Sequence, residues 1–549
     1  MQPLGTDGPC KHRQRRTMSD NATQLPTLPF EVIRRIIHFR LALPQIYPAP
    51  ITPHAQYHPS WDSWTGARGR EVESNMVAER RDVVRTAWGL VRVCKAWKAV
   101  VLQYLYASPN ITTNLQQLTF SILKGDAKWS DINLHAFSLP GRHVTTLDLS
   151  HIPLEVHRTV VKQSCLALFP LLPNVTHFKL GERETKCIPF GEIGWAAFAK
   201  MLKCLEGVWV DEREGMGREL VRLLKKLPNL EVLGVVGPGI SVESDETSGQ
   251  RPLQLSLPKL HTFKMEGVPS GDLVSTLLTA SLPSLTHLIL TPTPLMPFDQ
   301  SLALQTTLGP QIRSLTYLPP RGWPRSDTSI PPDTLDIHPE LIHLACLDGD
   351  FEGLDVLLRS PASTNHPLRV LTVPKWSPSC NSSDLFTSPP VAPSNLFPSH
   401  LLTPPPSPPH QSSTDASLPG PPFLRTLCSC SSTHPTHPGQ TRSGPNIKVI
   451  VIDGFKWVKP TLGQAAMRAG QSGEMRYWSG VLARKGIQLY DMEGETAPPV
   501  GNQSSVGYVT GGKAGGRRKS SNSVMNFGMG MRGRSSTPRE WGGCDEDGG

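Results

Sequence analysis

The stretch SLTHLILT at residues 284–291 decides the fold, because its pattern recurs along the chain. Leu285, Leu288 and Leu290 follow the order apolar-x-x-apolar-x-apolar, and the last two alternate with one outward residue, as in a short β-strand. The other copies have their first apolar residue at Val144, Val175, Leu205, Leu230, Leu260, Ile312, Leu341, Leu368 and Ile447. Apart from the last copy, the intervals are 25 to 31 residues, which indicates a protein built from repeated units.

The segments between the predicted strands have helical spacing. Apolar residues share one helix face in three of them, as Val156, Val160 and Val161, as Leu220, Leu223 and Leu224, and as Leu273, Leu277 and Leu278. One strand with one helix cannot bury its own apolar side, so the units must stack on their neighbours. We therefore expect an α/β solenoid of the leucine-rich-repeat type over residues 111–373, with a parallel sheet along its inner wall.

Three stretches have a composition that does not favour a packed core. Residues 374–445 are dominated by Pro and Ser, and residues 496–549 contain Gly and Ser runs with a basic cluster at 517–519. We expect disorder in both, and also in residues 1–24. Because a further copy of the strand pattern begins at Ile447, residues 374–445 are predicted to be a loop inserted between two neighbouring repeats.

The solenoid also needs a cover at each end. Residues 446–495 are predicted to form the last repeat and the C-terminal cap, in which IQLYDM at 487–492 is extended and a helix carries Met475, Trp478, Val481 and Leu482. The N-terminal cover must come from residues before 143.

Two short amphipathic helices are predicted near the N-terminus, at residues 27–39 and 88–105. In the first, Pro29 suits the first helical position. Its apolar stripe is Val32, Ile33, Ile36 and Ile37, and the second helix has Leu90, Cys94, Trp97 and Val101 on one face. Because so few residues cannot form a self-sufficient core, we expect a partner to complete their burial.

These two segments resemble the F-box of the F-box protein family, in the form common in fungal F-box proteins with leucine-rich repeats. In LPFEVIRRII at 28–37, Leu28, Pro29 and Glu31 match the family's Leu-Pro-x-Glu-apolar opening. In LVRVCKAWKAVVLQYLY at 90–106, Val93, Cys94 and Trp97 match its closing apolar-x-x-Val-Cys-x-x-Trp. The resemblance places an F-box at residues 25–110, in which residues 44–85 form an inserted loop that the usual motif lacks.

The resemblance implies a non-catalytic subunit of a ubiquitin ligase complex, not an enzyme. The F-box docks on the small Skp-family adaptor of a cullin ligase, and the repeats hold the protein to be ubiquitinated. We thus expect the substrate-recognition subunit of an SCF-type E3 ubiquitin ligase; the alternative is an F-box/LRR interaction scaffold without ligase activity. The candidates for adaptor contact are Leu28, Pro29, Ile33, Ile36, Val93 and Trp97, and each can instead be internal core of the helical unit.

The outward positions of the predicted strands are candidates for binding a protein substrate. His177, His287 and His343 stand at the third position of the pattern, and His261 is a further outward residue. The candidate substrate-binding residues are His177, Lys179, Trp209, Lys264, His287 and Arg313. This mildly basic wall suits an acidic or phosphorylated segment, and the alternative is an ordinary solvated face. If His177 and His287 take part, binding should strengthen as the pH falls from 7.5 to 6.

Other functions are disfavoured. The formal net charge of +9 is mild for 549 residues, so we expect no nucleic-acid partner. We expect no membrane span or signal peptide, and the ten scattered cysteines favour a reducing compartment, the cytoplasm, the nucleus or both. There is no catalytic signature motif, and no cofactor is expected. Four potential zinc ligands, Cys428, Cys430, His434 and His437, lack finger spacing, so no metal site is expected; Cys94, Cys204 and Cys346 fall at predicted core positions.

Overall fold

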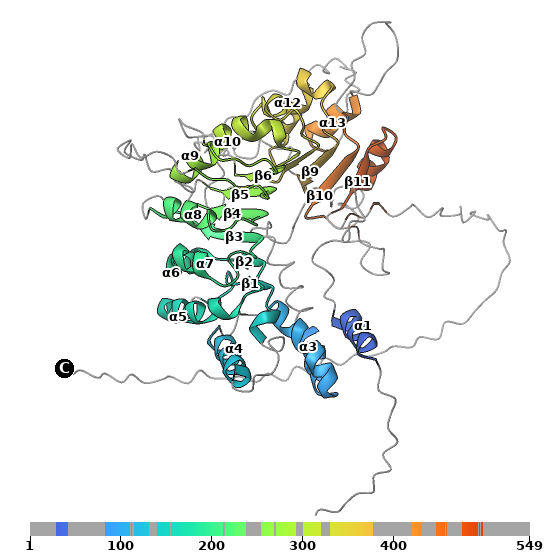
Figure 1. The fold of residues 1–549 in the computed structure, drawn as a ribbon. Helices are drawn as coiled ribbons and strands as arrows, with labels where there is room; N and C mark the ends of the chain where they lie inside the picture. The colour runs from blue at the N-terminus through green and yellow to red at the C-terminus, as the bar shows by residue number, and fades with distance from the viewer. Residues whose placement is uncertain are drawn as a thin grey trace, which may run out of the picture. The chain divides into compact units, whose positions relative to one another are not determined.

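The chain forms an α/β fold around one eleven-stranded parallel sheet (Figure 1). The structure is a computed structural model, and it describes residues 29–41, 83–109, 111, 115–130, 140–153, 155–211, 215–237, 254–267, 271–291, 300–319, 330–376, 420–429, 446–455, 457, 475–491, 494 and 496–497. The strands lie in sequence order, so each pairs with the strands before and after it along the chain. The predicted fold class, α/β with a parallel sheet, is confirmed.

The first ten strands coincide with the ten copies of the sequence pattern, and the eleventh lies in the segment predicted to be extended at 487–492. They are β1 (Thr146–Asp148), β2 (His177–Lys179), β3 (Cys204–Trp209), β4 (Val232–Val236), β5 (Thr262–Glu266), β6 (His287–Leu290), β7 (Ser314–Tyr317), β8 (His343–Cys346), β9 (Val370–Pro374), β10 (Val449–Asp453) and β11 (Gln488–Tyr490). At each strand the fourth residue of the pattern is buried, as Leu147, Phe178 and Leu288 illustrate. Phe178 contacts the rings of Phe169 and Phe198 edge-on, with centroids 5.9 and 5.6 Å away.

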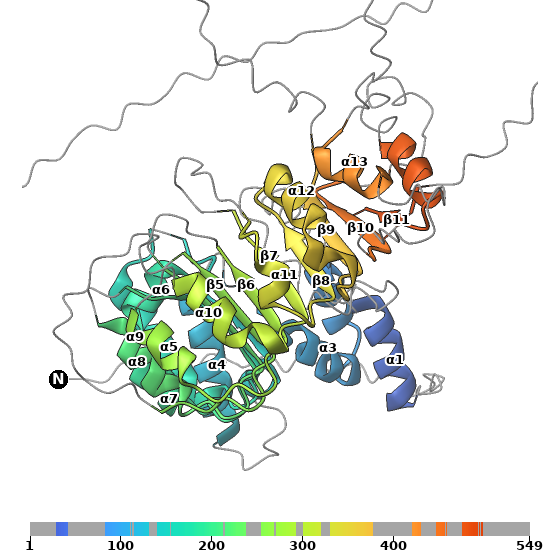
Figure 2. The ribbon, with the colours of Figure 1, turned by 90° about the horizontal axis from the view of Figure 1, so that it is seen from above.

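Helices connect the strands and pack against one another in a second layer (Figures 1 and 2). They are α5 (Arg158–Leu168), α6 (Glu182–Cys187), α7 (Phe190–Trp195), α8 (Met216–Leu224), α9 (Gly271–Leu278), α10 (Gln300–Leu308), α11 (Thr334–Ile337) and α12 (Phe351–Arg359), with 3₁₀ turns η4 (Phe169–Leu171), η6 (Gly309–Gln311) and η7 (Pro361–Thr364). Leu220, Leu223 and Leu224, predicted to share one face of α8, are all buried in the core. Burial of this apolar face determines which side of α8 points inward.

The residues directly before strands β1 to β10 form a hydrogen-bonded line that we call the strand-entry row. Each backbone N–H in this row donates to the carbonyl of its predecessor, with N···O distances of 2.7 to 3.1 Å. The members are Thr145, Thr176, Lys203, Glu231, His261, Thr286, Arg313, Ile342, Arg369 and Lys448. The row runs across the sheet, so it brings residues that are far apart in sequence to one edge.

A second ladder joins neighbouring units through side chains. Two residues before the row, the side chains of Asn174, Asn229, Ser284 and Gln311 donate to backbone carbonyls of the preceding unit, over 2.7, 2.7, 2.6 and 3.2 Å. Since the same position makes the same bond in several units, the sequence repeat is also a repeat of contacts.

Strand β3 departs from the predicted alignment. The sequence pattern was aligned with Leu205 as its first apolar residue, but Cys204 pairs with the first residues of both β2 and β4. The first position therefore belongs to Leu202, which is buried. The intervals to the neighbouring copies become 27 and 28 residues in place of 30 and 25, so the repeat is more regular than the sequence indicated.

The cause of the shifted alignment is Gly207. The register of β3 against β4 shifts between Leu205 and Val208, and Gly207 lies in this irregular stretch with a φ of +70°. A Cβ at this position would collide with the backbone carbonyl oxygen of Leu180. Because of the extra residue, Leu205, Val208 and Val210 also match the apolar pattern, three residues after its true position.

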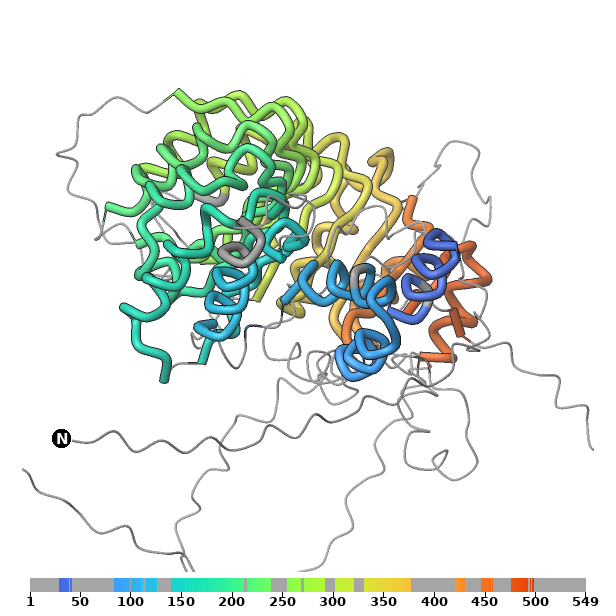
Figure 3. The backbone as a smooth tube through the Cα atoms, turned by 60° about the horizontal axis from the view of Figure 1, so that its bottom comes forward, coloured from blue at the N-terminus to red at the C-terminus, as the bar shows by residue number. Residues whose placement is uncertain are grey.

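Two helices and part of a third form the N-terminal region (Figure 3). They are α1 (Phe30–Leu41), a helix at residues 83–91 and α3 (Lys95–Ala107). The single helix predicted over 88–105 is wrong, because the chain leaves helical geometry at Cys94, which has φ −162° and ψ 173°. Cys94 is exposed, so its prediction as a core residue is also wrong, whereas Cys204 and Cys346 are buried.

The ends of these helices also differ from the prediction. Pro29 lies just before α1, where its carbonyl accepts the backbone N–H of Ile33 at 3.1 Å, and so it is not the first helical residue. Residues 83–85 are helical and so do not belong to the loop predicted at 44–85, and the rest of that loop lies outside the described residues.

The N-terminal cover of the sheet comes from residues before 143, as predicted. Helix α4 (Leu115–Ser130) packs against α5 and against the 3₁₀ turn η3 (Pro140–His143). Its residues Leu115 and Ile122 are buried in the main core. The backbone N–H of Thr145 donates to the carbonyl of Ala107 at 2.9 Å, which joins the end of α3 to the first strand.

The predicted disorder of residues 374–445 is wrong for one segment. Residues 422–429 form α13 (Pro422–Ser429), which packs against α12 with Phe423 and Leu424 fully buried (Figure 2). The ring of Trp376, just after β9, packs edge-on against the Phe423 ring, with 6.4 Å between the ring centroids. The average composition of the long stretch concealed this short apolar helix. Residues 377–419 and 430–445 lie outside the described residues.

The C-terminal part extends the sheet, in agreement with the predicted helix and extended segment. Residues 475–483 are helical, with Met475, Trp478 and Leu482 buried, and β11 pairs in parallel with β10. Thr496 makes an antiparallel bridge to Tyr490, although it was assigned to a disordered tail. Most of the tail, and residues 1–24, lie outside the described residues.

Candidate functional site

The N-terminal helices share a small apolar core that is separate from the main one. Ile33, Ile37 and Leu41 of α1 are buried in one cluster with Val100 and Val101 of α3. Their spacing of four residues places the three α1 side chains on one helix face. At the rim, Nδ1 of His38 lies 3.1 Å from the Tyr104 hydroxyl. Part of the predicted apolar stripe is therefore sealed within this chain.

Other large apolar side chains of these helices remain in solvent. Val32 and Ile36 of α1 are 39% and 38% exposed, and Phe30, Trp88 and Val93 are 48%, 55% and 59% exposed. We call these five residues the exposed apolar set. Val32 and Ile36 are four residues apart, so they lie on one face of α1. Large exposed apolar side chains that lie together, as Val32 and Ile36 do, are candidates for an interaction surface.

Some of the predicted adaptor residues are exposed in the structure, and others are buried in the small core. Ile36 and Val93 belong to the exposed apolar set, and Pro29 is exposed. Ile33 is buried, and Trp97 packs half-buried on the same small core, so the internal-core alternative holds for Ile33 and partly for Trp97. Leu28 lies outside the described residues. Phe30 and Trp88 are not singled out by the sequence analysis, although Phe30 lies in the quoted opening segment and Trp88 in the helix predicted over 88–105.

On the sheet, the histidines of the third pattern position share a register but do not form one site. His177 is in β2, His287 in β6 and His343 in β8, and the pairing of the intervening strands keeps them aligned. Strands are about 4.8 Å apart, so His177 and His287 are separated by roughly 19 Å. These rings are aligned along the sheet, and a small ligand could not contact both.

His343 is a structural residue. Its side chain is fully buried, with Nδ1 2.8 Å from Ser314 Oγ and Nε2 3.0 Å from Thr372 Oγ1. The ring therefore joins β7, β8 and β9, and its buried polar atoms are satisfied by neighbours. His343, which the sequence pattern predicts to face outward, is therefore not accessible to a client protein.

The burial of the histidines weighs against the expected pH response of binding. Burial lowers the pKa of His177, and burial lowers the pKa of His287 to about 4, with the nearby His261 acting in the same direction. The rings of His261 and His287 lie 6.2 Å apart. His287 therefore stays neutral between pH 7.5 and 6 and supplies no increase in positive charge, and burial shifts the pKa of His177 in the same direction.

The predicted basic residues on the sheet are largely neutralised by acidic neighbours. Lys179 Nζ lies 3.9 Å from Asp148, and Lys264 Nζ lies 3.6 Å from Glu266. Lys264 is buried, so it offers little surface to a client. Trp209 is occupied as well, since the ammonium of Lys186 lies 5.2 Å from its ring centroid.

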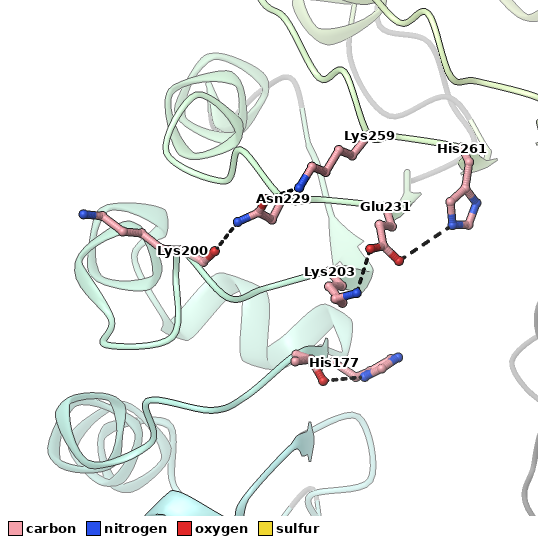
Figure 4. Close-up of polar contacts among 8 residues, drawn as sticks. His177, Lys200, Lys203, Asn229, Glu231, Lys259 and His261 are labelled. Carbon is pink, nitrogen blue, oxygen red and sulfur yellow. Dashed lines mark hydrogen bonds and ion pairs between the residues drawn. The ribbon is translucent and has the colours of Figure 1, made fainter.

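The first half of the strand-entry row is also internally paired (Figure 4). Lys203 Nζ lies 2.8 Å from Glu231, whose other carboxylate oxygen lies 4.0 Å from His261 Nε2. Beside the row, Lys259 Nζ donates to Asn229 Oδ1 at 2.7 Å. The local charges compensate one another, which leaves little net field for an external ligand.

The second half of the row carries uncompensated cations. Arg313, Arg369 and Lys448 precede β7, β9 and β10, and all three are exposed. Within the part of the chain that the structure describes, none of the three side chains has an ion pair or hydrogen bond. Arg313 was predicted from the sequence, whereas Arg369 and Lys448 were missed. The available signal was the second position of the strand pattern, next to the histidine position.

The described residues include His, Cys, Asp and Glu side chains, the types that ligate metals. No group of three or more His, Cys, Asp or Glu side chains among them could hold a metal ion. Of the potential zinc ligands, Cys428 lies in α13 and the other three lie outside the described residues. Burial raises the pKa of Cys165 to about 12, and it also raises the pKa of Cys204 and Cys346, so these thiols stay protonated and unreactive.

Comparisons with known proteins add no family to this description. A scan against protein-family models found no match for the chain, and a search of curated proteins also found none. None of the helices in the described residues is both long and apolar enough to span a membrane. The fold and the surfaces define an α/β protein with a sequentially paired parallel sheet, an exposed apolar set and a basic sheet edge.

Proposed function

We propose that the chain is the substrate-recognition subunit of an SCF-type E3 ubiquitin ligase, built from an F-box and a leucine-rich-repeat solenoid. The exposed apolar set docks on a Skp-family adaptor, which connects the chain to a cullin. The sheet holds a client protein. The chain performs no bond chemistry, and it acts by raising the effective concentration of client lysines near the ubiquitin-charged conjugating enzyme.

The exposure of Ile36 and Val93 carries the proposal. Both belong to the segments that resemble an F-box, and both remain in solvent although the helices have built a small core from other residues. Burial of one such side chain contributes about 1.5–3 kcal/mol. An apolar groove on an adaptor would therefore stabilise a complex through the residues that this chain leaves exposed.

The arrangement of the sheet supports the second half of the proposal. Each unit pairs with its sequence neighbours, and the strand-entry row and the side-chain ladder repeat the same bonds from unit to unit. Nearest-neighbour stacking of this kind is the principle of solenoid proteins, which present extended surfaces to partners.

Affinity purification of the full chain from cells tests the adaptor contact. The variant carries Ile36→Asp and Val93→Asp, which place charges at exposed positions and leave the small core intact. We expect wild type to capture the adaptor and the cullin, and the variant to lose at least about tenfold of both, because a buried unpaired charge costs several kcal/mol. A matched control is Val356→Asp on α12, another exposed apolar position, 59% in solvent, which should not change capture.

Circular dichroism must first show that the double variant is folded. Capture of neither adaptor nor cullin by folded wild type contradicts the proposal. Capture of the adaptor without ubiquitin transfer to a bound client, in an assay with purified conjugating components, would favour the scaffold alternative.

A further inference from the structure

The strand-entry row changes its charge character along the sheet. From β3 to β5 its members are Lys203, Glu231 and His261, which compensate one another. From β7 to β10 its charged members are Arg313, Arg369 and Lys448, with Ile342 as the remaining residue. The row members from β3 to β5 therefore compensate one another's charge, whereas the row is cationic from β7 to β10.

The geometry of the row fixes the spacing of the cations. Backbone hydrogen bonds link Arg313 to Ile342, Ile342 to Arg369 and Arg369 to Lys448, at 2.9, 2.9 and 2.8 Å. With about 4.8 Å between strands, Arg313 and Arg369 are roughly 10 Å apart, and Arg369 and Lys448 are neighbours. Ile342, partly exposed, offers an apolar contact between the two cationic points.

We propose that Arg313, Arg369 and Lys448 bind an extended anionic segment of a client protein, with two anionic side chains three residues apart. In a polyproline-II segment, residues i and i+3 lie on one face about 9 Å apart, which matches the separation of Arg313 and Arg369. One anionic group lies between Arg369 and Lys448, and the other pairs with Arg313. The inference rests on the proposed function and names the chemistry of its client.

A peptide fits this edge better than a nucleic acid. A duplex or single strand presents a phosphate at every nucleotide and requires a cationic surface over its whole length. In the same row the carboxylate of Glu231 lies where a longer polyanion would continue, and it would repel the additional phosphates. The cationic stretch accommodates only a short segment with few charges.

Fluorescence anisotropy with the purified full chain, without an adaptor, tests the inference at about 100 mM salt. The probes are fluorescein-labelled twelve-residue peptides on a Ser/Ala/Gly background. One has phosphoserines at i and i+3, one has Glu at these positions, and one has unmodified Ser. Binding of only the first would identify phosphate as the anionic group, and equal binding of the second would show that carboxylates suffice. Either result supports an anionic segment, while the Ser peptide should bind at least tenfold more weakly.

The decisive variant is Arg313→Gln, Arg369→Gln and Lys448→Gln. It should weaken binding of the anionic peptide at least tenfold, since it removes the three cationic side chains proposed to pair with the anionic groups. The matched control is Lys162→Gln, Lys200→Gln and Lys225→Gln, which makes the same change in net charge at exposed positions on α5, after α7 and after α8. The control should change affinity by less than twofold.

Three results would overturn the inference. They are equal affinity of wild type for all three peptides, equal weakening by both triple variants, and tighter binding of a twelve-nucleotide poly(dT) than of either anionic peptide. Because the adaptor is absent from this assay, its failure leaves the adaptor capture experiment unaffected. Conversely, failure of adaptor capture with intact peptide binding would remove the ligase assignment and leave the anion site.

Discussion

The N-terminal helices and the parallel sheet bury apolar side chains in different ways. In the sheet, one core runs from the N-terminal cover to the last strand, and each unit completes the burial of its neighbour. The N-terminal helices have only the small core around Ile37, and they leave Ile36, Val93 and other large apolar residues in solvent. The comparison indicates that repeated units bury their apolar side chains against neighbouring units of the same chain. A short helical unit has too few residues to bury all of its own apolar side chains.

The largest expected effect concerns the continuity of the sheet core. Phe178→Ala should destabilise the chain by about 3–5 kcal/mol, because the ring is fully buried against Phe169 and Phe198 and its removal leaves a cavity. Urea unfolding followed by circular dichroism measures the change. The matched control is Phe120→Ala on α4, an exposed ring that should cost under about 0.5 kcal/mol. A cost below about 1 kcal/mol for Phe178→Ala would show that the units do not share one core.

A smaller effect is expected where the repeat is locally irregular. Gly207→Ala should cost about 2–3 kcal/mol, because a Cβ there meets both a left-handed backbone and the Leu180 carbonyl. Gly215→Ala separates these two causes, since Gly215 has φ +66° but no atom within 4 Å of a Cβ. It should cost only about 1 kcal/mol in the same unfolding assay. Equal costs would mean that the approach of β3 to Leu180 does not constrain the bulge.

Sequence reasoning was sufficient for the order of the strands and less so for local departures from periodicity. The apolar pattern located every strand within the repeats, since burial on one side of a strand leaves a period of two. It misaligned β3, because a bulge at a glycine is visible only through its backbone angle. It also missed α13, because Phe423 and Leu424 are diluted by the surrounding Pro and Ser.

The candidate surfaces were partly accessible to the same reasoning. An apolar stripe on α1 was predicted, but periodicity does not reveal which side meets another helix, so Ile33 and Ile36 could not be separated. Likewise the outward histidines were identified, but not the burial that makes His343 a link between strands. Arg369 and Lys448 became candidates only when the hydrogen-bonded row placed them beside Arg313.

The smallest expected effect concerns the pH dependence of stability, which is compared for one histidine in each of the two regions. The sheet region contains His338, which is fully buried, with Nδ1 3.4 Å from the Gly309 carbonyl oxygen. Burial lowers its pKa to about 4, and the neighbouring His366 acts in the same direction. In the unfolded chain a histidine titrates near 6.5, so between pH 6.5 and 4 the unfolded state binds more protons. Stability therefore falls as the pH falls through this window, by at most about 1.4 kcal/mol per pH unit for this group.

Replacing His338 by Gln should remove about 2 kcal/mol of the stability difference between pH 7 and pH 5, measured by urea unfolding at each pH. The same substitution at an exposed histidine of the N-terminal helices, His38→Gln, is measured beside it for comparison. The unfolding free energy at pH 7 need not be the same in the variants, since the prediction concerns the slope alone. A His338→Gln variant with the full wild-type slope would assign the acid sensitivity to other groups, and it would show that this ring is not held neutral inside the sheet region.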